Sequence, residues 1–377
     1  MNPLAPTRIP FASLTPEAVR HWVAREGFPD YRAAQLLRWF YRSRASSFSE
    51  MTNLPRRLID QLDTQFDFST VTPRQRRSAD QGETSKYLFE LPDGELLESV
   101  AMHYARTPGR RERTTVCLST QVGCAIRCTF CATGLQGLKR NLSTADTIDQ
   151  VLVVARDSGR QARRVGQLVY MGMGEPLHNL EVTLASLRRF TDSNALGLGV
   201  RRVTVSTAGV VPGIDRLALD GGGSNLAISL HAPIDELRDR LVPLNRRWPI
   251  AELLAAARRY AQSTGRRVSY EYVMLRGVND SELLADGLGR LLAGELAHVN
   301  LIPYNPIPGD PFASSSPSAI DRFRERVRSH AVECTVRDTR GRRIDAACGQ
   351  LRAEAGPAAR QASSRPVAGE LAGLPQN

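Results

Sequence analysis

Two neighbouring pieces of sequence, TTVCLS at 114–119 and GCAIRCTFC at 123–131, decide how the chain is read. The first is a short run of β-branched and apolar residues, which is typical of a buried strand. The second follows closely and places Cys124, Cys128 and Cys131 at the spacing C-x3-C-x2-C. One short loop after a strand therefore offers three thiolates together.

Three thiolates are one fewer than a 4Fe–4S cluster normally takes. The fourth iron is then open, and S-adenosylmethionine can chelate it through its amino and carboxylate groups. Its sulfonium then lies close enough to accept an electron and cleave into a 5′-deoxyadenosyl radical. We therefore expect Cys124, Cys128 and Cys131 to ligate one 4Fe–4S cluster, with S-adenosylmethionine bound beside it.

Two plainer interpretations of these cysteines are a zinc site and a set of buried free thiols. Zinc needs a fourth ligand, and no nearby His or Cys has zinc-type spacing. Chance does not readily gather three of only six cysteines within eight residues. The cluster interpretation is therefore favoured over both.

Outward from this loop, strand-like runs alternate with helical stretches over some 190 residues. Such alternation predicts a parallel sheet, and six units fall short of the eight of a closed barrel. One intervening helix, 144–156, starts at a capping box made by Ser143 and Asp146. We expect an α/β fold with a partial (β/α)6 barrel over 111–353, its strands being 114–119, 166–171, 201–206, 225–230, 268–274 and 299–303.

The flanking segments have other patterns. Residues 1–75 read as a small helical accessory domain, with Thr15 and Pro16 opening its first helix; it can bind RNA or simply pack. Region 76–110 carries a β-hairpin around the turn Asp93-Gly94 and links the two domains. The segment 354–377 has no periodicity and is expected to be disordered.

Composition bounds the function. Fifty Lys and Arg against 39 Asp and Glu give a formal net charge of +11, which favours a polyanionic partner such as nucleic acid, although solvated helix faces have the same composition. No apolar run is long enough to cross a bilayer, and the N-terminus lacks a secretory pattern. We expect a cytoplasmic protein that does not associate with membranes.

Polar residues follow most of the predicted strands, at the barrel end where chemistry gathers. They include Gly174 and Glu175, then Ser206, then Ser229, Leu230 and His231, and finally Asn305. Each alone is an ordinary cap or turn residue. Together they outline one pocket suited to a ribose, an adenine and an amino acid.

Four motifs now support a family resemblance. They are GCAIRCTFCATG at 123–134, MGMGEPL at 171–177, SLHA at 229–232 and DAACGQL at 345–351. Together they closely resemble the RlmN-type radical-SAM methyltransferases. This resemblance implies methylation of carbon 2 of adenine 2503 in 23S rRNA and of adenine 37 in some tRNAs, with two S-adenosylmethionine molecules per turnover.

The resemblance also implies roles for single residues. Cys348 would carry the methyl group, and Cys117 would resolve the protein–RNA adduct through a transient disulfide. Glu98 would accept a proton, as Cys117 also could, and Gly174, Glu175, Ser206, 229–231 and Asn305 would contact S-adenosylmethionine. The link 103–113 is longer than the family pattern, which leaves the reach of Glu98 open.

Two alternatives remain at this stage. A sister, Cfr-like activity methylates carbon 8 of the same adenosine with the same cysteines, and a non-catalytic, zinc-stapled RNA-binding protein is a different class altogether. We further expect an external electron donor, whose identity the sequence does not reveal, and a monomer. Without it, Cys334, His178 and His231 read as packing residues.

Overall fold

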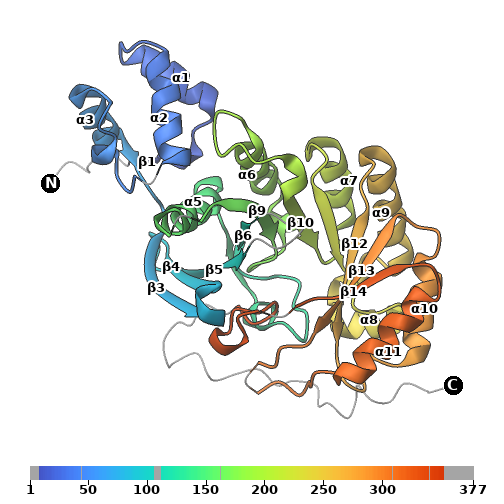
Figure 1. Cartoon of the computed structure of the whole chain (residues 1–377). Helices are drawn as coiled ribbons and strands as arrows, with labels where there is room; N and C mark the ends of the chain where they lie inside the picture. The colour runs from blue at the N-terminus through green and yellow to red at the C-terminus, as the bar shows by residue number, and fades with distance from the viewer. Residues whose placement is uncertain are drawn as a thin grey trace.

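The computed structural model describes residues 8–351 except 44, 106–111, 162, 308 and 339. The predicted tail 354–377 lies outside these residues. Figure 1 shows a small helical domain at the N-terminal end, set beside a larger body built around one long curved sheet. In the described part of the chain this sheet has ten strands, in the order β14-β13-β12-β11-β10-β9-β6-β5-β4-β3.

The six predicted barrel strands are all present and parallel. A seventh parallel strand, β14 (Glu333–Val336), pairs with the last of them and contains the buried Cys334. The partial-barrel fold is therefore confirmed, with one strand more than expected. The six are β6 (Arg113–Cys117), β9 (Val165–Tyr170), β10 (Val203–Thr207), β11 (Asn225–Ser229), β12 (Val268–Met274) and β13 (Ala297–Pro303).

Helices connect the parallel strands and cover the outer face of the sheet (Figure 1). Apolar strand residues such as Val205, Ile228 and Val299 are fully buried beneath them. The capping box of Ser143 and Asp146 is confirmed at the start of the first of these helices. They are α5 (Thr144–Arg160), α6 (Leu180–Thr191), α7 (Val211–Asp220), α8 (Asp235–Leu241), α9 (Ile250–Thr264), α10 (Glu282–Leu292) and α11 (Pro317–Arg328).

The predicted hairpin consists of β4 (Thr84–Glu90) and β5 (Leu96–Tyr104), and Gly94 has the positive φ of +81° that its turn requires. A third antiparallel strand, β3 (Thr72–Ala79), lies on its outer side. β5 pairs antiparallel with β6. The region expected to be a linker therefore continues the barrel sheet.

The N-terminal domain contains α1 (Pro16–Arg25), α2 (Tyr31–Arg42) and α3 (Arg56–Gln65). Two short strands, β1 (Ile9–Pro10) and β2 (Phe66–Asp67), pair beside them, and a cluster of aromatic rings fills the centre. The domain is attached to the barrel by buried polar contacts. The Thr70 amide donates to Asp149 Oδ2 at 2.8 Å, and Arg156 Nη2 donates to the Phe40 carbonyl at 3.3 Å.

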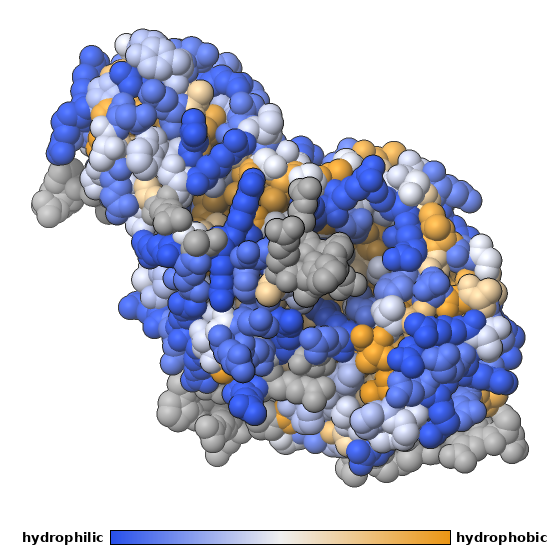
Figure 2. Space-filling view, in the orientation of Figure 1, coloured by the Kyte–Doolittle hydropathy of each residue, from blue (hydrophilic) through white to orange (hydrophobic). Residues whose placement is uncertain are grey.

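The surface seen in Figure 2 is largely hydrophilic over both the N-terminal domain and the barrel. Within the described residues, no helix is both long and apolar enough to cross a membrane.

The N-cap of α1 offers a test of how this domain is held. The Ala18 amide donates to Thr15 Oγ1 at 3.1 Å. Thr15→Ala removes that acceptor and should lower the free energy of unfolding of the domain by about 1 kcal/mol. Denaturant titration followed by fluorescence of Trp22 and Trp39 measures the change. Thr15→Ser keeps the acceptor and should leave the midpoint unchanged; equal midpoints for both variants would contradict this role.

Candidate active site

The three motif cysteines lie in a loop between β7 (Gln121–Gly123) and the short helix α4 (Ala132–Gln136). Gly123 has φ +76°, and a Cβ there would lie 1.8 Å from the Gly137 carbonyl oxygen. The Cys124 amide donates to the same carbonyl at 3.0 Å. Only glycine allows this close approach, so Gly123 sets the direction in which the loop leaves the strand.

The surroundings of the thiols suit metal-bound thiolates. Burial raises the pKa of the Cys124 thiol to about 12, although amides of Ile126 and Arg127 point at it and favour the charged form. Desolvation and the charges of Cys131 and Cys124 raise the pKa of Cys128 well above its usual value. Three thiolates packed together need cations between them.

The donor set of this loop consists of three thiols. An iron–sulfur cluster normally takes four cysteine thiolates, so Cys124, Cys128 and Cys131 would leave one iron without a protein ligand.

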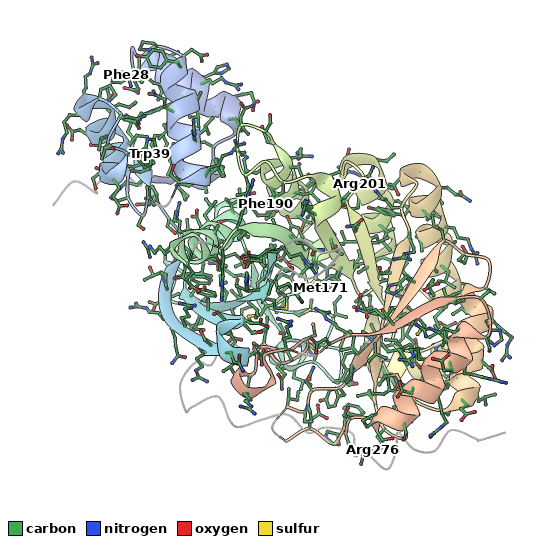
Figure 3. All side chains as sticks on the ribbon, in the orientation of Figure 1. Phe28, Trp39, Met171, Phe190, Arg201 and Arg276 are labelled. Atoms are coloured by element: carbon green, nitrogen blue, oxygen red, sulfur yellow. The ribbon has the colours of Figure 1, made fainter. Side chains whose placement is uncertain are left out.

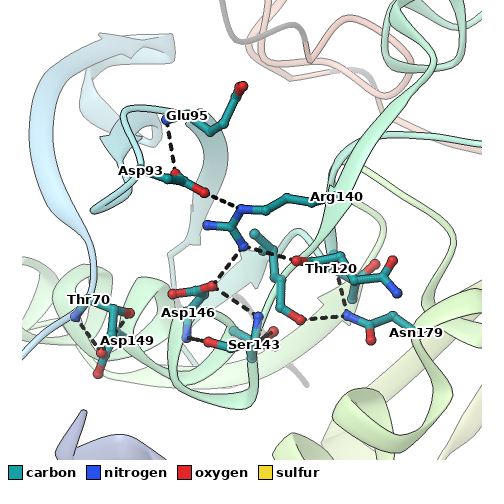
Figure 4. A network of polar contacts seen from close by, with 12 residues as sticks. Thr70, Asp93, Glu95, Thr120, Arg140, Ser143, Asp146, Asp149 and Asn179 are labelled. Atoms are coloured by element: carbon teal, nitrogen blue, oxygen red, sulfur yellow. Dashed lines mark hydrogen bonds and ion pairs between the residues drawn. The ribbon is translucent and has the colours of Figure 1, made fainter. Parts of the chain in front are cut away.

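A network of polar contacts holds the base of this loop in place (Figure 4). Arg140, on β8 (Leu138–Asn141), forms ion pairs with Asp93 in the hairpin turn and with Asp146 at the start of α5. Asn179 Nδ2 donates to the carbonyls of Thr120, at 2.9 Å, and Leu142, at 2.8 Å. Hairpin, cysteine loop and first barrel helix are thereby joined.

The segment after β9 lies directly against the cysteine loop. Gly174 has φ +100°, and a Cβ there would approach the Gln121 side chain to 2.6 Å. The buried Glu175 carboxylate accepts from the amides of Leu177 at 3.0 Å and Ala208 at 2.7 Å. Burial raises the pKa of Glu175 to about 7, and its charge acts on Cys124 and Cys128.

The next strand ends are tied together by Arg238, which the sequence analysis missed. This buried side chain donates to the carbonyls of Ala208 (2.6 Å), Ser229 (3.1 Å) and Leu230 (3.0 Å). Ser206, on β10, pairs in register with Ala227 of β11. The Leu230 side chain is fully buried, and its amide donates to the Glu271 carbonyl at 3.0 Å.

His231 is a neutral residue in this setting. Its Nδ1 accepts from the Val273 amide at 3.0 Å, and its ring packs edge-on against Phe130 at 4.8 Å. Burial lowers the pKa of His231 to about 3, so the ring carries no charge at neutral pH. It also has a positive φ of +62°, so its backbone turns sharply at the barrel mouth.

Cys117 and Cys348, 231 positions apart in sequence, line the same cavity. Its volume is about 460 Å³ including the open mouth, and Asn305 and Met171 also line it. Figure 3 shows Met171 in the middle of the barrel. Burial, together with the charge of Cys348, raises the pKa of the Cys117 thiol to about 12.

Arg337 lies in the same cavity and is a second residue that sequence reasoning missed. It directly follows β14, so counting the run at 333–336 as a barrel strand would have pointed to it. The charges of Cys348 and, more weakly, Glu271 and Cys117 raise its pKa. Its Nη1 lies 3.8 Å from the Met171 sulfur. The cavity therefore holds a cation between two thiols.

The segment that carries Cys348 is bonded to the cysteine loop. The Ala132 amide donates to the Gly349 carbonyl at 2.8 Å, and Thr133 Oγ1 donates to the Leu351 carbonyl at 2.6 Å. Both donors follow Cys131 directly in sequence. The candidate cluster ligands and the candidate methyl carrier thus form one connected unit.

Glu98 is buried on β5 and forms an ion pair with Lys86 of β4, another residue that sequence reasoning missed. The long link 103–113 does not displace it, because β5 and β6 pair on either side of that link, from Val100 with Cys117 to Tyr104 with Arg113. Of this link, residues 106–111 lie outside the described part.

Comparisons with known proteins identify the class of this chain. Residues 118–286 match the radical SAM superfamily, and residues 10–67 match the ribosomal RNA large subunit methyltransferase N-terminal domain. A crystal structure of a radical SAM methyltransferase from Sphaerobacter thermophilus is 48% identical and superposes with a TM-score of 0.88, covering 92% of this chain and all of the other. The fold and site define a radical-SAM enzyme, a class that uses an iron–sulfur cluster and S-adenosylmethionine.

Curated relatives narrow the family. Proteins named probable dual-specificity RNA methyltransferase RlmN, from Thermobifida fusca and Moorella thermoacetica, are 48% and 44% identical. The alignments cover 93% and 92% of this chain, and 97% and 98% of the relatives. The chain belongs to the RlmN family of RNA methyltransferases.

Gly123 provides a test of the cysteine loop. Gly123→Ala should reduce iron bound after anaerobic reconstitution several-fold, because its Cβ collides with the Gly137 carbonyl and displaces Cys124. Gly94→Ala is the matched control: it has a similar φ of +81° but open space around its Cβ. Iron analysis and visible absorbance give the result, with circular dichroism to compare folding. Equal iron loss in both variants would mean that backbone strain alone is responsible.

Proposed function

We propose that this chain methylates carbon 2 of adenine 2503 in 23S rRNA and of adenine 37 in some tRNAs, using Cys348 as a methyl carrier. The observation that carries the proposal is the shared cavity of Cys117 and Cys348, bonded to the cysteine loop. The relatives' description as dual-specificity enzymes fits two kinds of RNA substrate.

The need for a carrier follows from the chemistry of adenine. Carbon 2 is an electrophilic amidine carbon, so it does not take a methyl cation directly from S-adenosylmethionine. A thiolate does, by ordinary displacement. Cys348 would form an S–CH₃ bond while S-adenosylhomocysteine leaves, and the guanidinium of Arg337 would stabilise the attacking thiolate.

Cys124, Cys128 and Cys131 would hold the 4Fe–4S cluster, which when bound supplies the electron that cleaves a second S-adenosylmethionine. Gly174, Glu175, Ser206, 229–231 and Asn305 would hold that molecule at the strand ends. At these strand ends the His231 ring would be neutral, and the Glu175 carboxylate would be the acidic group beside the loop.

The remaining steps belong to three side chains. After a hydrogen atom leaves the methyl group of Cys348, the methylene carbon bonds to carbon 2 and links RNA to protein. Glu98 or Cys117 would take the proton of carbon 2, and the unpaired electron of the adduct would pass to a one-electron acceptor, a role that an oxidised iron–sulfur cluster would supply. The Cys117 sulfur would then attack Cys348, and an S–S bond would form as the S–C bond breaks. The S–C electron pair would stay on the methylene carbon, which would take a proton and leave as methyladenosine. An external thiol reductant must reopen the disulfide.

We further propose that the N-terminal domain contacts RNA, that an external protein donates the electron, and that the enzyme acts as a cytoplasmic monomer. The net charge of +11 favours a polyanionic substrate. The N-terminal domain is attached to the barrel through Thr70 and Arg156. RNA bound to that domain would therefore have a defined orientation relative to the cavity.

The two carrier cysteines should fail at different steps. Cys348→Ala should abolish transfer of labelled methyl from S-adenosylmethionine to protein, whereas Cys117→Ala should allow it and trap a covalent protein–RNA adduct. Denaturing gels and nucleoside mass spectrometry measure both. Freely released product from Cys117→Ala would overturn its role, and 8-methyladenosine from the wild type would identify the Cfr-like activity instead.

Release of the product should depend on pH. Burial raises the pKa of the Cys117 thiol to about 12, so the thiol is almost wholly protonated at neutral pH and its thiolate fraction grows roughly tenfold per pH unit. The rate of adduct release in a single turnover should therefore rise between about pH 7 and pH 9. If adduct formation is complete and the rate of release still does not change with pH, Cys117 is not the attacking group.

A further inference from the structure

A buried ion pair lies beside the cavity, in the antiparallel part of the sheet. Lys86 Nζ is 2.9 Å from Glu98 Oε1, and the two side chains expose only 10% and 5% of their surface. Burying two charges costs desolvation energy, so such a pair is weak evidence of added stability. Its position in the sheet indicates another use.

The strand register places this pair next to Cys117. Lys86 pairs with Val100 of β5, and Val100 pairs with Cys117 of β6, so these three residues form one row across three strands. Because side chains alternate along a strand, Glu98 shares a face with Val100 and Met102, and both of these line the cavity. Glu98 is thus a diagonal neighbour of Cys117, at about 7–8 Å between backbones.

Lys86 has a second partner on the carrier segment. Its Nζ donates to the Asp345 carbonyl at 3.3 Å, three positions before Cys348. The same segment is held to the turn between β3 and β4 by the Gly341 amide, which donates to Asp80 Oδ2 at 2.9 Å, and by Arg340, which pairs with Glu83 at 2.9 Å. One ammonium therefore connects Glu98 with the segment that presents the bound adenine.

We propose that Lys86 is a positioning residue for proton removal from the adduct. Through the 2.9 Å ion pair it fixes the Glu98 carboxylate beside Val100 and Met102, which line the cavity, until the adenine is linked to Cys348. The C–H bond of carbon 2 then breaks, its electron pair stays in the ring, and an O–H bond forms on Glu98. The unpaired electron left by the earlier radical addition would pass to a one-electron acceptor, a role that an oxidised iron–sulfur cluster would supply. Lys86 keeps its own proton throughout. This inference rests on the proposed function and adds a residue to it.

The ion pair is suited to this step for an electrostatic reason. An ammonium at hydrogen-bond distance favours the ionised carboxylate, which is the form that can accept a proton. The contact to Asp345 makes the arrangement depend on the carrier segment being in place. Glu98 would thereby be aligned at the stage when the methylene carbon on Cys348 is bonded to carbon 2 of the adenine.

The test separates two stages of a single turnover in the reconstituted enzyme with an RNA fragment. Lys86→Met should load labelled methyl onto Cys348 within twofold of wild type, but release product from the adduct about 10- to 100-fold more slowly. Lys86→Arg keeps the cation and should recover most of that rate. Lys86→Gln also removes the charge but stays polar, so it should slow release as Lys86→Met does even if Lys86→Met folds poorly. Thermal melts compare the stability of all the variants.

A double variant shows whether Lys86 acts through Glu98. Glu98→Gln should slow release by itself, and adding Lys86→Met should slow it no further. Additive slowing would overturn the proposal, as would wild-type release by Lys86→Met. A defect confined to methyl loading of Cys348 would also overturn it, assigning Lys86 to the carrier segment. Wild-type enzyme that makes no 2-methyladenosine would instead contradict the proposed function.

Discussion

The structure depends on two hydrogen bonds that hold the end of the described chain onto the cysteine loop, from Ala132 to Gly349 and from Thr133 to Leu351. Both donors belong to the turn that also positions Cys131. A barrel that is closed on itself would leave no room for this segment. Because the sheet stays open, Cys348 can lie over the strand ends and face Cys117.

The second constraint is the antiparallel pairing of β5 with β6. Because of this pairing, the hairpin is part of the sheet, and Val100 and Met102 of β5 line the cavity. Glu98 and Lys86 then lie beside Val100, a residue that lines the cavity, on strands that precede the radical-SAM core in sequence. Arg337 lines the cavity from near the other end of the described chain. The charged residues in and beside the cavity of Cys117 and Cys348 therefore come from widely separated segments.

Local sequence patterns predicted much of this fold. The six parallel strands, the hairpin and the caps at Thr15 and Ser143 were all found, because each depends on neighbouring residues. β3 was missed because its residues are mostly polar and exposed, which hides any strand period. β14 was missed as a barrel strand because it is only four residues long.

Spacing and family motifs were enough to select the three loop cysteines and Cys348 as candidate site residues, and these assignments stay predictions. Arg337, Arg238 and Lys86 could not be selected in this way, because only long-range contacts connect them to the site. Lys86 meets Asp345 across 259 positions, and no periodicity links two residues so far apart. A lysine in a hairpin looks like a solvated charge until the sheet around it is known.

The strand β3 ends the sheet in the described part of the chain, and its outer edge has consequences for solubility. An open edge can recruit the edge of another molecule and start aggregation. Pro73 removes one amide donor, the pairing is irregular between Pro73 and Gln75, and arginines crowd the strand, with Arg74, Arg76 and Arg77 close together. Arg74 and Arg76 form ion pairs with Glu90 and Asp157 and keep this edge polar, so it is a poor template for pairing with the edge of a second copy.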